Sequence, residues 1–372
     1  MKKQNNNSAD NLMIIPVFIM NDGCPHKCIF CNQSVTAGNY SSLLTKDKFE
    51  IIVNSYLDSN FNNNRKVEIA FYGGNFTGLR RLTQEDYLYW ANYYIDKGLV
   101  QGLRISTRPD YITDDILSLL KKYNVSVIEL GAQSFVDEVL THAQRGHDAA
   151  CIENAVKLIK KYSILSSIHL MIGLPKDTKE GFLYSLKKTA ELKPDMARIN
   201  PTLVLKNTTL AQQYIQGDYV PLILTDAVDL CRVAFEMLSA AGIRVIRFGL
   251  HISEEMNKDG AVLAGPMHDS LGSIVLSSFF YHKTLEVLKN IPPNTNEVHL
   301  KISSSDESAF RGWRNNNVSS LKTLYPRTQI TIESSPVLKK GDVYFSFDSS
   351  GPNFLNFYQQ NNCSLTEAYK IV

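Results

Sequence analysis

The sequence lacks the features that would place it in a membrane or on a nucleic acid. None of its apolar runs approaches the roughly 18 residues that a membrane-spanning helix needs. Lys2 and Lys3 precede an apolar run at 12–20, but mostly polar residues intervene and no small-residue cleavage site follows, so we interpret the run as a buried strand. The 39 basic and 37 acidic side chains give a net charge of only +2, without the positive excess typical of phosphate binding. We therefore expect a soluble, cytoplasmic protein, with no membrane partner and with nucleic acid binding not favoured.

Cysteine is scarce and unevenly placed. Of the six cysteines, three lie within residues 24–31 and the others stand alone at 151, 231 and 363. This distribution does not fit a disulfide framework, and the absence of a second close grouping argues against an auxiliary iron–sulfur cluster. Clustered thiols in a reducing compartment instead indicate one metal site.

Internal repeats are also absent, and the only low-complexity segment is the polar, Asn-rich stretch 1–11, which we expect to be a disordered tail. From residue 12 to about 250, short Val/Ile/Leu-rich runs alternate with longer stretches of helical periodicity, which indicates six or seven βα units around a parallel sheet. Helices are expected at 83–97, with Thr83 and Asp86 as a capping box, and at 149–161. The expected strands are 13–20, 66–72, 103–107, 125–130, 167–172, 196–202 and 243–248.

The alternation of strand-like and helical stretches ends at about residue 290. Pro292, Pro293 and Asn294 form an expected linker, and strand-like runs follow at 297–303, 329–333 and 342–347. We therefore predict a barrel domain over 12–290 and a small carboxyl-terminal α/β domain over 291–372. Polar or Gly-rich clusters follow most of the barrel strands, and the carboxyl ends of strands form the active-site face of a (β/α) barrel.

Cys24, Cys28 and Cys31 follow the first strand, in a loop where three thiolates can converge. Structural zinc sites and ferredoxin-type clusters both take four protein ligands. Three thiolates on a 4Fe–4S cube leave one iron open, and that iron can chelate the amino and carboxylate groups of S-adenosylmethionine (SAM). A zinc knuckle with His26 as its fourth ligand is the alternative.

The spacing CxxxCxφC, with Phe30 at φ, resembles the hallmark of the radical SAM superfamily, and the resemblance spans roughly residues 13–285. It implies an α/β fold with a partial (β/α)6-type TIM barrel. It also implies a 4Fe–4S cluster held by the three cysteines, reductive cleavage of SAM to a 5′-deoxyadenosyl radical, and an electron donor of the flavodoxin or ferredoxin type. The segments 71–78, 105–111, 129–134 and 198–204 are similar to the subgroup around the catalytic subunit of Elongator.

The resemblance also implies a set of cofactor-binding residues. Phe30 corresponds to the aromatic near the adenine, and Gly73, Gly74 and Asn75 stand where the superfamily has a Gly-Gly-Glu segment that binds the methionyl amine. Asn cannot supply a carboxylate, so a backbone carbonyl is expected to serve. The remaining SAM contacts implied by the coproporphyrinogen dehydrogenase branch and by strand-end position are Ser106, Arg108, Gln133, Arg145 and His169.

Three of these residues also have a purely structural interpretation: Gln133 as a strand cap, His169 as a core histidine and Arg108 in an ion pair with Asp110. Tyr72, His251 and His268 are expected to contact substrate, with docking of the carboxyl-terminal domain as the alternative for the two histidines. The predicted reaction is hydrogen abstraction from a small or medium organic substrate. A tRNA- or porphyrin-directed radical SAM enzyme, or a non-catalytic Fe–S or RNA-binding scaffold, is the alternative; the absence of a Gly-rich acyl-CoA loop after residue 290 argues against acetyltransfer.

Overall fold

The computed structural model describes residues 12–19, 23–25, 27–36, 44–60, 65–250, 254, 256–258, 260–348 and 350–358. The expected disordered tail at 1–11, the alternative zinc ligand His26, the substrate candidate His251 and the isolated Cys363 lie outside these residues. Within the described residues, no helix is long and apolar enough to cross a membrane.

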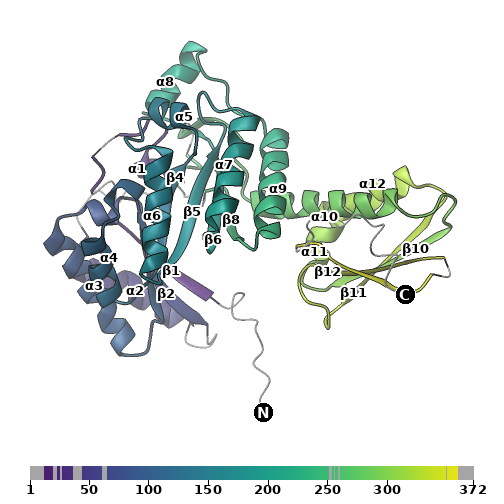
Figure 1. Cartoon of the computed structure of the whole chain (residues 1–372), viewed down its shortest axis with the longest axis horizontal. Coiled ribbons are helices and arrows are strands. Elements are labelled where there is room, and N and C mark those ends of the chain that lie inside the picture. Colours follow the sequence, from purple (N-terminus) through teal and green to yellow (C-terminus); the bar gives the residue numbers. More distant parts are fainter. Residues whose placement is uncertain are drawn as a thin grey trace. The chain divides into compact units, whose positions relative to one another are not determined.

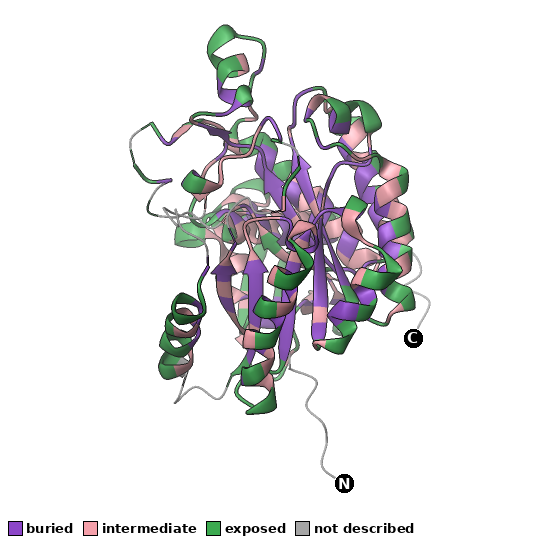
Figure 2. Ribbon diagram, turned by 90° about the vertical axis from the view of Figure 1, so that its left-hand side faces the viewer, coloured by how far each residue is buried: buried purple, intermediate pink, exposed green. Residues whose placement is uncertain are grey.

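Seven parallel strands form a curled half-barrel in the order β1-β2-β3-β4-β5-β6-β8 (Figure 1). The strands are β1 Leu12–Phe18, β2 Lys66–Tyr72, β3 Gly102–Thr107, β4 Val125–Gln133, β5 Leu165–Ile172, β6 Met196–Pro201 and β8 Arg244–Phe248. Each coincides, within a few residues at its ends, with a strand expected from the apolar runs. The strands are mostly buried while the helices expose one face (Figure 2). The predicted α/β half-barrel is therefore confirmed.

The helices between the strands are amphipathic, and several begin at a side-chain cap. They are α1 Gln33–Thr36, α2 Lys46–Asn60, α3 Arg81–Asp96, α4 Asp114–Lys122, α5 Asp137–His142, α6 Ala149–Lys161 and α7 Lys179–Leu192. Helix α6 has the expected bounds, and the Asp148 carboxylate accepts the Cys151 backbone N–H at 2.8 Å. The predicted capping box of α3 is wrong. Helical bonding already begins where the Gln84 N–H donates to Arg80 O, which places Thr83 inside the helix.

Two compact units result from the packing. The first comprises the chain up to Leu222 together with Leu250–Pro266. Besides β1 to β6, it contains the 3₁₀ turns η1 Phe76–Gly78 and η2 Pro109–Tyr111, helix α8 Thr209–Gln216, and an antiparallel pair of β7 Val204–Leu205 and β9 Val262–Ala264. The β7–β9 pair was not expected from the sequence because strands of two and three residues are too short to show alternation.

The second unit comprises Ile223–Gly249 and the chain from Met267 onward. Its helices are α9 Leu224–Ala240, α10 Leu271–Lys289, α11 Glu307–Arg311 and α12 Asn316–Leu324, with the 3₁₀ turn η3 Trp313–Asn315. A four-stranded sheet has the order β11-β10-β12-β13, with β10 Glu297–Ser303, β11 Gln329–Ser335, β12 Asp342–Phe347 and β13 Asn353–Asn356. Strand β13 was not expected from the sequence.

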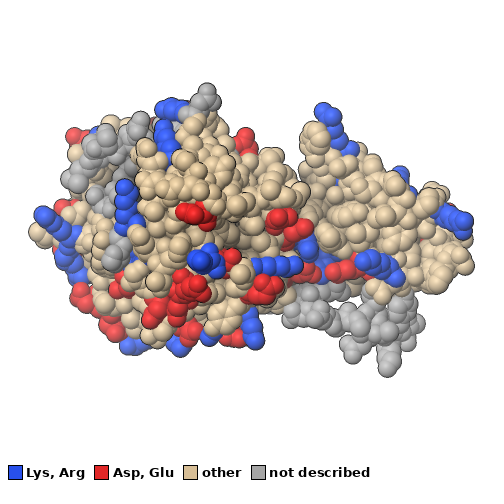
Figure 3. Space-filling model, turned by 90° about the horizontal axis from the view of Figure 1, so that it is seen from above, with Lys and Arg blue, Asp and Glu red and all other residues tan. Residues whose placement is uncertain are grey.

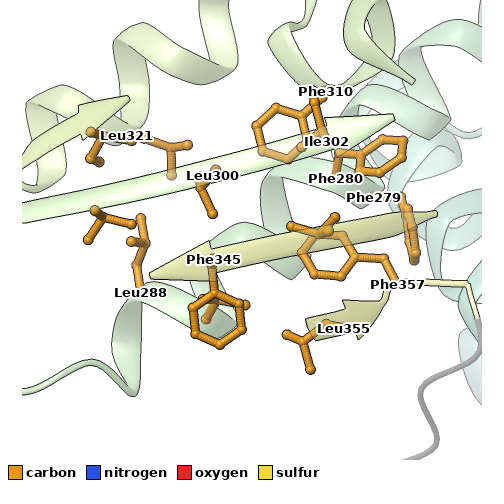
Figure 4. Packing of buried hydrophobic residues seen from close by; sticks show 14 of the residues in the cluster. Phe279, Phe280, Leu288, Leu300, Ile302, Phe310, Leu321, Phe345, Leu355 and Phe357 are labelled. Atoms are coloured by element: carbon orange, nitrogen blue, oxygen red, sulfur yellow. The ribbon is translucent and has the colours of Figure 1, made fainter. Parts of the chain in front are cut away.

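One hydrophobic core joins the helices and the sheet of this second unit (Figure 4). Phe279 and Phe280 of α10 pack with Leu300 of β10, Phe345 of β12 and Phe357, and all five side chains are buried. Helix α10 thus shares its core with the carboxyl-terminal sheet, whereas the sequence-based division lies after it, at residue 290. The domain limits 12–290 and 291–372 stay a prediction.

Candidate active site

Most of the expected cofactor-binding residues lie at or near the carboxyl ends of neighbouring strands. Parallel strands end at the same edge of a sheet, so the loops that follow β1 to β5 are brought together. The cysteine loop follows β1, Gly73 to Asn75 follow β2, Arg108 follows β3, Gln133 ends β4, and His169 lies on β5. The topology therefore gathers residues that are up to 145 positions apart, from Cys24 to His169.

The three thiols differ in exposure: Cys28 is buried, Cys31 is partly buried and Cys24 is exposed. Desolvation, with added repulsion from Cys28 and Cys24, raises the pKa of Cys31 to about 12. The pKa of Cys24 is also raised, again by desolvation first and then by Cys28, while Arg108 and Arg145 oppose the shift. Thiolate ligation would therefore depend on a bound metal to stabilise the charge.

No group of three His, Cys, Asp or Glu side chains among the described residues is drawn together tightly enough to hold a single metal ion. The zinc-knuckle alternative requires His26 as its fourth ligand, and His26 lies outside the described residues.

Arg145 connects the cysteine loop to β4. One guanidinium nitrogen donates to Cys28 Sγ at 3.1 Å, and another donates to the Gly131 carbonyl at 2.5 Å. The Arg145 side chain is buried, and its Nε has no hydrogen-bond partner. A cation held beside the Cys28 sulfur, with a donor that has no partner, is suited to an anionic cofactor group.

Gln133 lies beside Arg145, and a β-carbon on Gly131 would come within 3.0 Å of the Gln133 amide nitrogen and 3.2 Å of the Arg145 guanidinium. Gln133 adopts a left-handed backbone conformation with φ of 70°. Its amide oxygen is buried without a partner. Buried polar atoms without partners are costly in a folded protein. The unpaired atoms of Gln133 and Arg145 therefore fit a polar cofactor bound beside Cys28.

The Asn75 side chain is fully buried and is bound by protein atoms on both sides of its amide. Its Nδ2 donates to Gly23 O at 2.8 Å, and its Oδ1 accepts from Thr107 Oγ1 at 2.6 Å and from the Arg108 N–H at 3.2 Å. Gly73, two residues earlier, has a φ of 82°, a conformation that favours glycine.

A buried ionic network, which was not expected from the sequence, crosses the interior of the half-barrel. Glu129 accepts from Tyr72 Oη at 2.7 Å, from Arg104 at 3.1 Å and from Arg198 at 3.0 Å. Arg104 also pairs with Glu68 at 2.8 Å. Charged residues within otherwise apolar strands were the available signal, because an ionised side chain is rarely buried without a partner.

The network also changes the interpretation of Tyr72, whose hydroxyl donates to Glu129. Desolvation, followed by the neighbouring Glu129 charge, raises the pKa of Tyr72 far above its usual value. His169 is paired in register with Gly131 and Arg198. Desolvation first, then Arg198, lowers the pKa of His169 to about 3, so its ring is neutral at physiological pH.

The other expected residues have mixed placements. Arg108 forms a bidentate ion pair with Asp110 at 2.8 and 3.0 Å, the alternative to SAM binding that was expected for this residue. Ser106 is partly buried on β3. The partly buried Phe30 packs against two hydrophobic clusters, one formed by Val139, Met171 and Leu174 and one that includes Val204 and Leu210. His268 belongs to the second unit, where its Nδ1 accepts the Ser270 N–H at 3.0 Å.

His147, which was not assigned to the site, is close enough to Arg145 for the two charges to interact. Desolvation first, then Arg145, lowers the pKa of His147 to about 4. Its Nε2 atom is buried without a partner. The Arg-Gly-His sequence at 145–147 was the only available signal.

Two family models match consecutive parts of this chain. The model of the radical SAM superfamily matches residues 18–188, and the model of the radical SAM carboxyl-terminal domain matches residues 194–279. A Methanocaldococcus jannaschii protein named tRNA uridine(34) acetyltransferase is 26% identical over 278 residues, which cover 63% of this chain and 50% of that protein. Elongator complex protein 3 of Saccharomyces cerevisiae is 30% identical over 187 residues, covering 44% of this chain and 33% of that protein.

Among solved structures, an amino-terminally truncated Elp3 from Methanocaldococcus infernus has the same fold, with a TM-score of 0.58 and 20% identity. The likeness covers 75% of this chain and 63% of that one. The chain spans about half the length of the curated relatives it matches. Enzymes that share the matched domains use a 4Fe–4S cluster and SAM as cofactors. The three-cysteine loop on a half-barrel and the two consecutive domain matches agree, and the chain belongs to the radical SAM superfamily of enzymes.

Proposed function

We propose that Cys24, Cys28 and Cys31 hold the 4Fe–4S cluster and that the chain cleaves SAM reductively, then abstracts a hydrogen atom from an organic substrate. The observation that carries the proposal is the contact of Arg145 with Cys28 and Gly131, beside buried unpaired atoms of Gln133 and Arg145. A cluster held there would supply the electron that cleaves SAM to methionine and a 5′-deoxyadenosyl radical. A cytoplasmic flavodoxin or ferredoxin would supply that electron.

In this proposal each part of the strand-end face has its own task. Arg145 binds the SAM carboxylate through its free Nε while it stays anchored to Gly131. Gln133 accepts a hydrogen bond through its unpaired oxygen. The neutral His169 ring and Ser106 contact the ribose or methionine, and Tyr72 lies on the substrate side, held by Glu129.

The proposal is tested by cofactor loading and turnover. Protein reconstituted anaerobically with iron and sulfide should contain about four irons per chain and, with dithionite, should form 5′-deoxyadenosine and methionine from SAM. Liquid chromatography measures both products. Stoichiometric zinc, with no deoxyadenosine from a fully reconstituted sample, would leave the zinc-knuckle interpretation standing.

A tRNA substrate is the second candidate, because the similarity includes a tRNA uridine(34) acetyltransferase and Elongator complex protein 3. The charge distribution does not favour it: the net charge is +2, and acidic and basic side chains are intermixed on the face seen in Figure 3. Bulk tRNA added to the reconstituted enzyme distinguishes the candidates. A tRNA-directed enzyme should form deoxyadenosine faster with tRNA than with an equal phosphate concentration of DNA.

A further inference from the structure

Asn75 stands where the superfamily has the acidic residue expected to bind the SAM amine, yet its side chain is occupied by the protein. We propose that Asn75 is a positioning residue that fixes the loop carrying Cys24, and that its side chain is not a SAM ligand. The inference rests on the proposed function, because it concerns the loop that holds the cluster. Its basis is three hydrogen bonds, to Gly23, Thr107 and Arg108, made by a side chain with no exposed surface.

The orientation of the Asn75 amide is fixed by its partners. Gly23 O is a carbonyl and can only accept, so the amide nitrogen must face it. The Arg108 backbone N–H can only donate, so the amide oxygen must face it. Both ends of the group are therefore matched, and neither end can turn toward a ligand without breaking a bond to the backbone.

Two glycines allow the Asn75 side chain to reach the cysteine loop. A β-carbon on Gly78 would lie 2.3 Å from both Asn75 Nδ2 and Gly23 O, directly on the hydrogen bond. A β-carbon on Gly23 would lie 2.3 Å from the Asn75 carbonyl oxygen, and Gly23 has a left-handed φ of 75°. The residue before Cys24 thus packs against the turn after β2 with no room for a side chain.

The other end of the contact is anchored on β3. Thr107 Oγ1 gives its one hydrogen to Asn75, so Thr77 Oγ1, at 2.5 Å, must donate to Thr107. Thr77 and Thr107 are both buried, and Gln84 of α3 donates to the Thr77 carbonyl at 3.1 Å. Asn75 therefore connects the loop that carries Cys24 to a chain of hydrogen bonds that runs from Thr107 on β3 through Thr77 to Gln84 on α3.

The proposal predicts the effect of restoring the carboxylate. Asn75→Asp keeps the acceptor for Thr107 and Arg108 but replaces the donor to Gly23 with a charged oxygen that faces a carbonyl oxygen. Were Asn75 a SAM ligand, the carboxylate would tighten SAM binding. Were it the anchor of the loop, Asn75→Asp would release Gly23 and disorder Cys24. Because a buried carbonyl would lose its donor, we expect a roughly tenfold loss of cluster occupancy at limiting iron.

The experiment compares wild type, Asn75→Asp, Gly78→Ala and the control Asn92→Asp. Asn92 accepts an exposed hydrogen bond from Asn124, so the control makes the same chemical change without the same contact. Gly78→Ala places a methyl group against the hydrogen bond between Asn75 and Gly23, while residue 75 stays an asparagine. Each protein is reconstituted anaerobically at limiting iron, and iron and sulfide per chain are measured together with the electron paramagnetic resonance spectrum of the reduced cluster, without SAM. Far-ultraviolet circular dichroism checks that each variant is folded.

Lower cluster occupancy and a broadened spectrum in both Asn75→Asp and Gly78→Ala, with Asn92→Asp like wild type, would support the proposal. Wild-type cluster occupancy in Asn75→Asp, or a Gly78→Ala protein that loads its cluster like wild type, would overturn it. Variants that do not fold would be replaced by Thr107→Val, which removes the donor to Asn75 Oδ1. A wild type that loads no cluster would instead refute the proposed function, so the two failures are distinct.

Discussion

Glu129→Gln tests the buried ionic network most directly. The Glu129 side chain is 3% exposed and accepts hydrogen bonds from Tyr72, Arg104 and Arg198. Glutamine has nearly the same volume, but it removes the negative charge and turns an NH2 group toward at least one donor. The variant therefore changes charge and hydrogen bonding and leaves packing almost unaltered.

The expected loss of stability in Glu129→Gln depends on which of the arginines keeps an acidic partner. In the variant, Arg104 still pairs with Glu68 at 2.8 Å. The cation left without an acidic partner is Arg198, whose side chain is 19% exposed and therefore partly hydrated. Removing one partner of a buried pair costs about 3–5 kcal/mol, and the remaining pair and partial hydration place Glu129→Gln near the lower end. The free energy of unfolding at pH 7 should thus fall by about 3 kcal/mol.

The pH dependence provides a second test. Desolvation would raise the pKa of Glu129, but Arg198, Arg104 and the Tyr72 hydroxyl outweigh it and lower the pKa below its ordinary value of 4.5. The stabilisation is therefore fully present above pH 4.5 and is lost as the pH falls through the lower, folded-state pKa. The difference between wild type and Glu129→Gln should shrink correspondingly. Urea unfolding of the metal-free protein, followed by circular dichroism from pH 7 to well below pH 4.5, measures it.

The control is Glu153→Gln, which removes a partly exposed pair with Lys188 at 2.9 Å and should cost less than about 1 kcal/mol. A loss in Glu129→Gln no larger than in Glu153→Gln would refute the reasoning. Adding Arg198→Met to Glu129→Gln removes the unpaired cation and should restore part of the lost stability. No recovery would show that the Arg198 charge is not the source of the loss.

Three further predictions follow. Cys28→Ala should abolish deoxyadenosine formation, whereas Cys231→Ala, in the buried face of α9, should leave it intact; equal losses by chromatography would contradict the assignment of the cluster ligands. The folded-state pKa of His169 is lowered to about 3 from 6.5, so its contribution to stability is present above pH 6.5 and is lost as the pH falls toward 3. His169→Gln should therefore make the free energy of unfolding less dependent on pH in this range. An unchanged pH profile would contradict this prediction. Phe279→Ala should destabilise the second unit by about 3–5 kcal/mol in denaturant unfolding, while Phe354→Ala, half exposed, should cost far less; similar costs would show that Phe279 is not central to that core.

The sheet could be predicted because its signals are local. Apolar runs gave the strands of the half-barrel, and the helical periodicity at 149–161 gave α6 with its bounds. The start of α3 could not be predicted in this way, since Gln84 donates to the Thr77 and Leu79 carbonyls and so stabilises a start that no local capping pattern shows.

For the candidate site, the sequence carries a signal only where a residue type has few common uses. Three closely spaced cysteines predict a metal site, either an iron–sulfur cluster or a zinc knuckle. Asn75 carries no such signal, because its contacts with Gly23 and Thr107 join residues 52 and 32 positions away. The Glu129 network likewise depends on Arg104 and Arg198 from two other strands, which no local pattern pairs.

The shared core of α10 and the carboxyl-terminal sheet decides where this protein can be shortened. A fragment ending at residue 290 would retain Phe279 and Phe280 but lose their partners Leu300, Phe345 and Phe357. Aromatic surface that is normally covered would then face water, and such surface promotes self-association. An expression fragment limited to the half-barrel should therefore precipitate unless it ends before α10 or carries polar replacements at both phenylalanines.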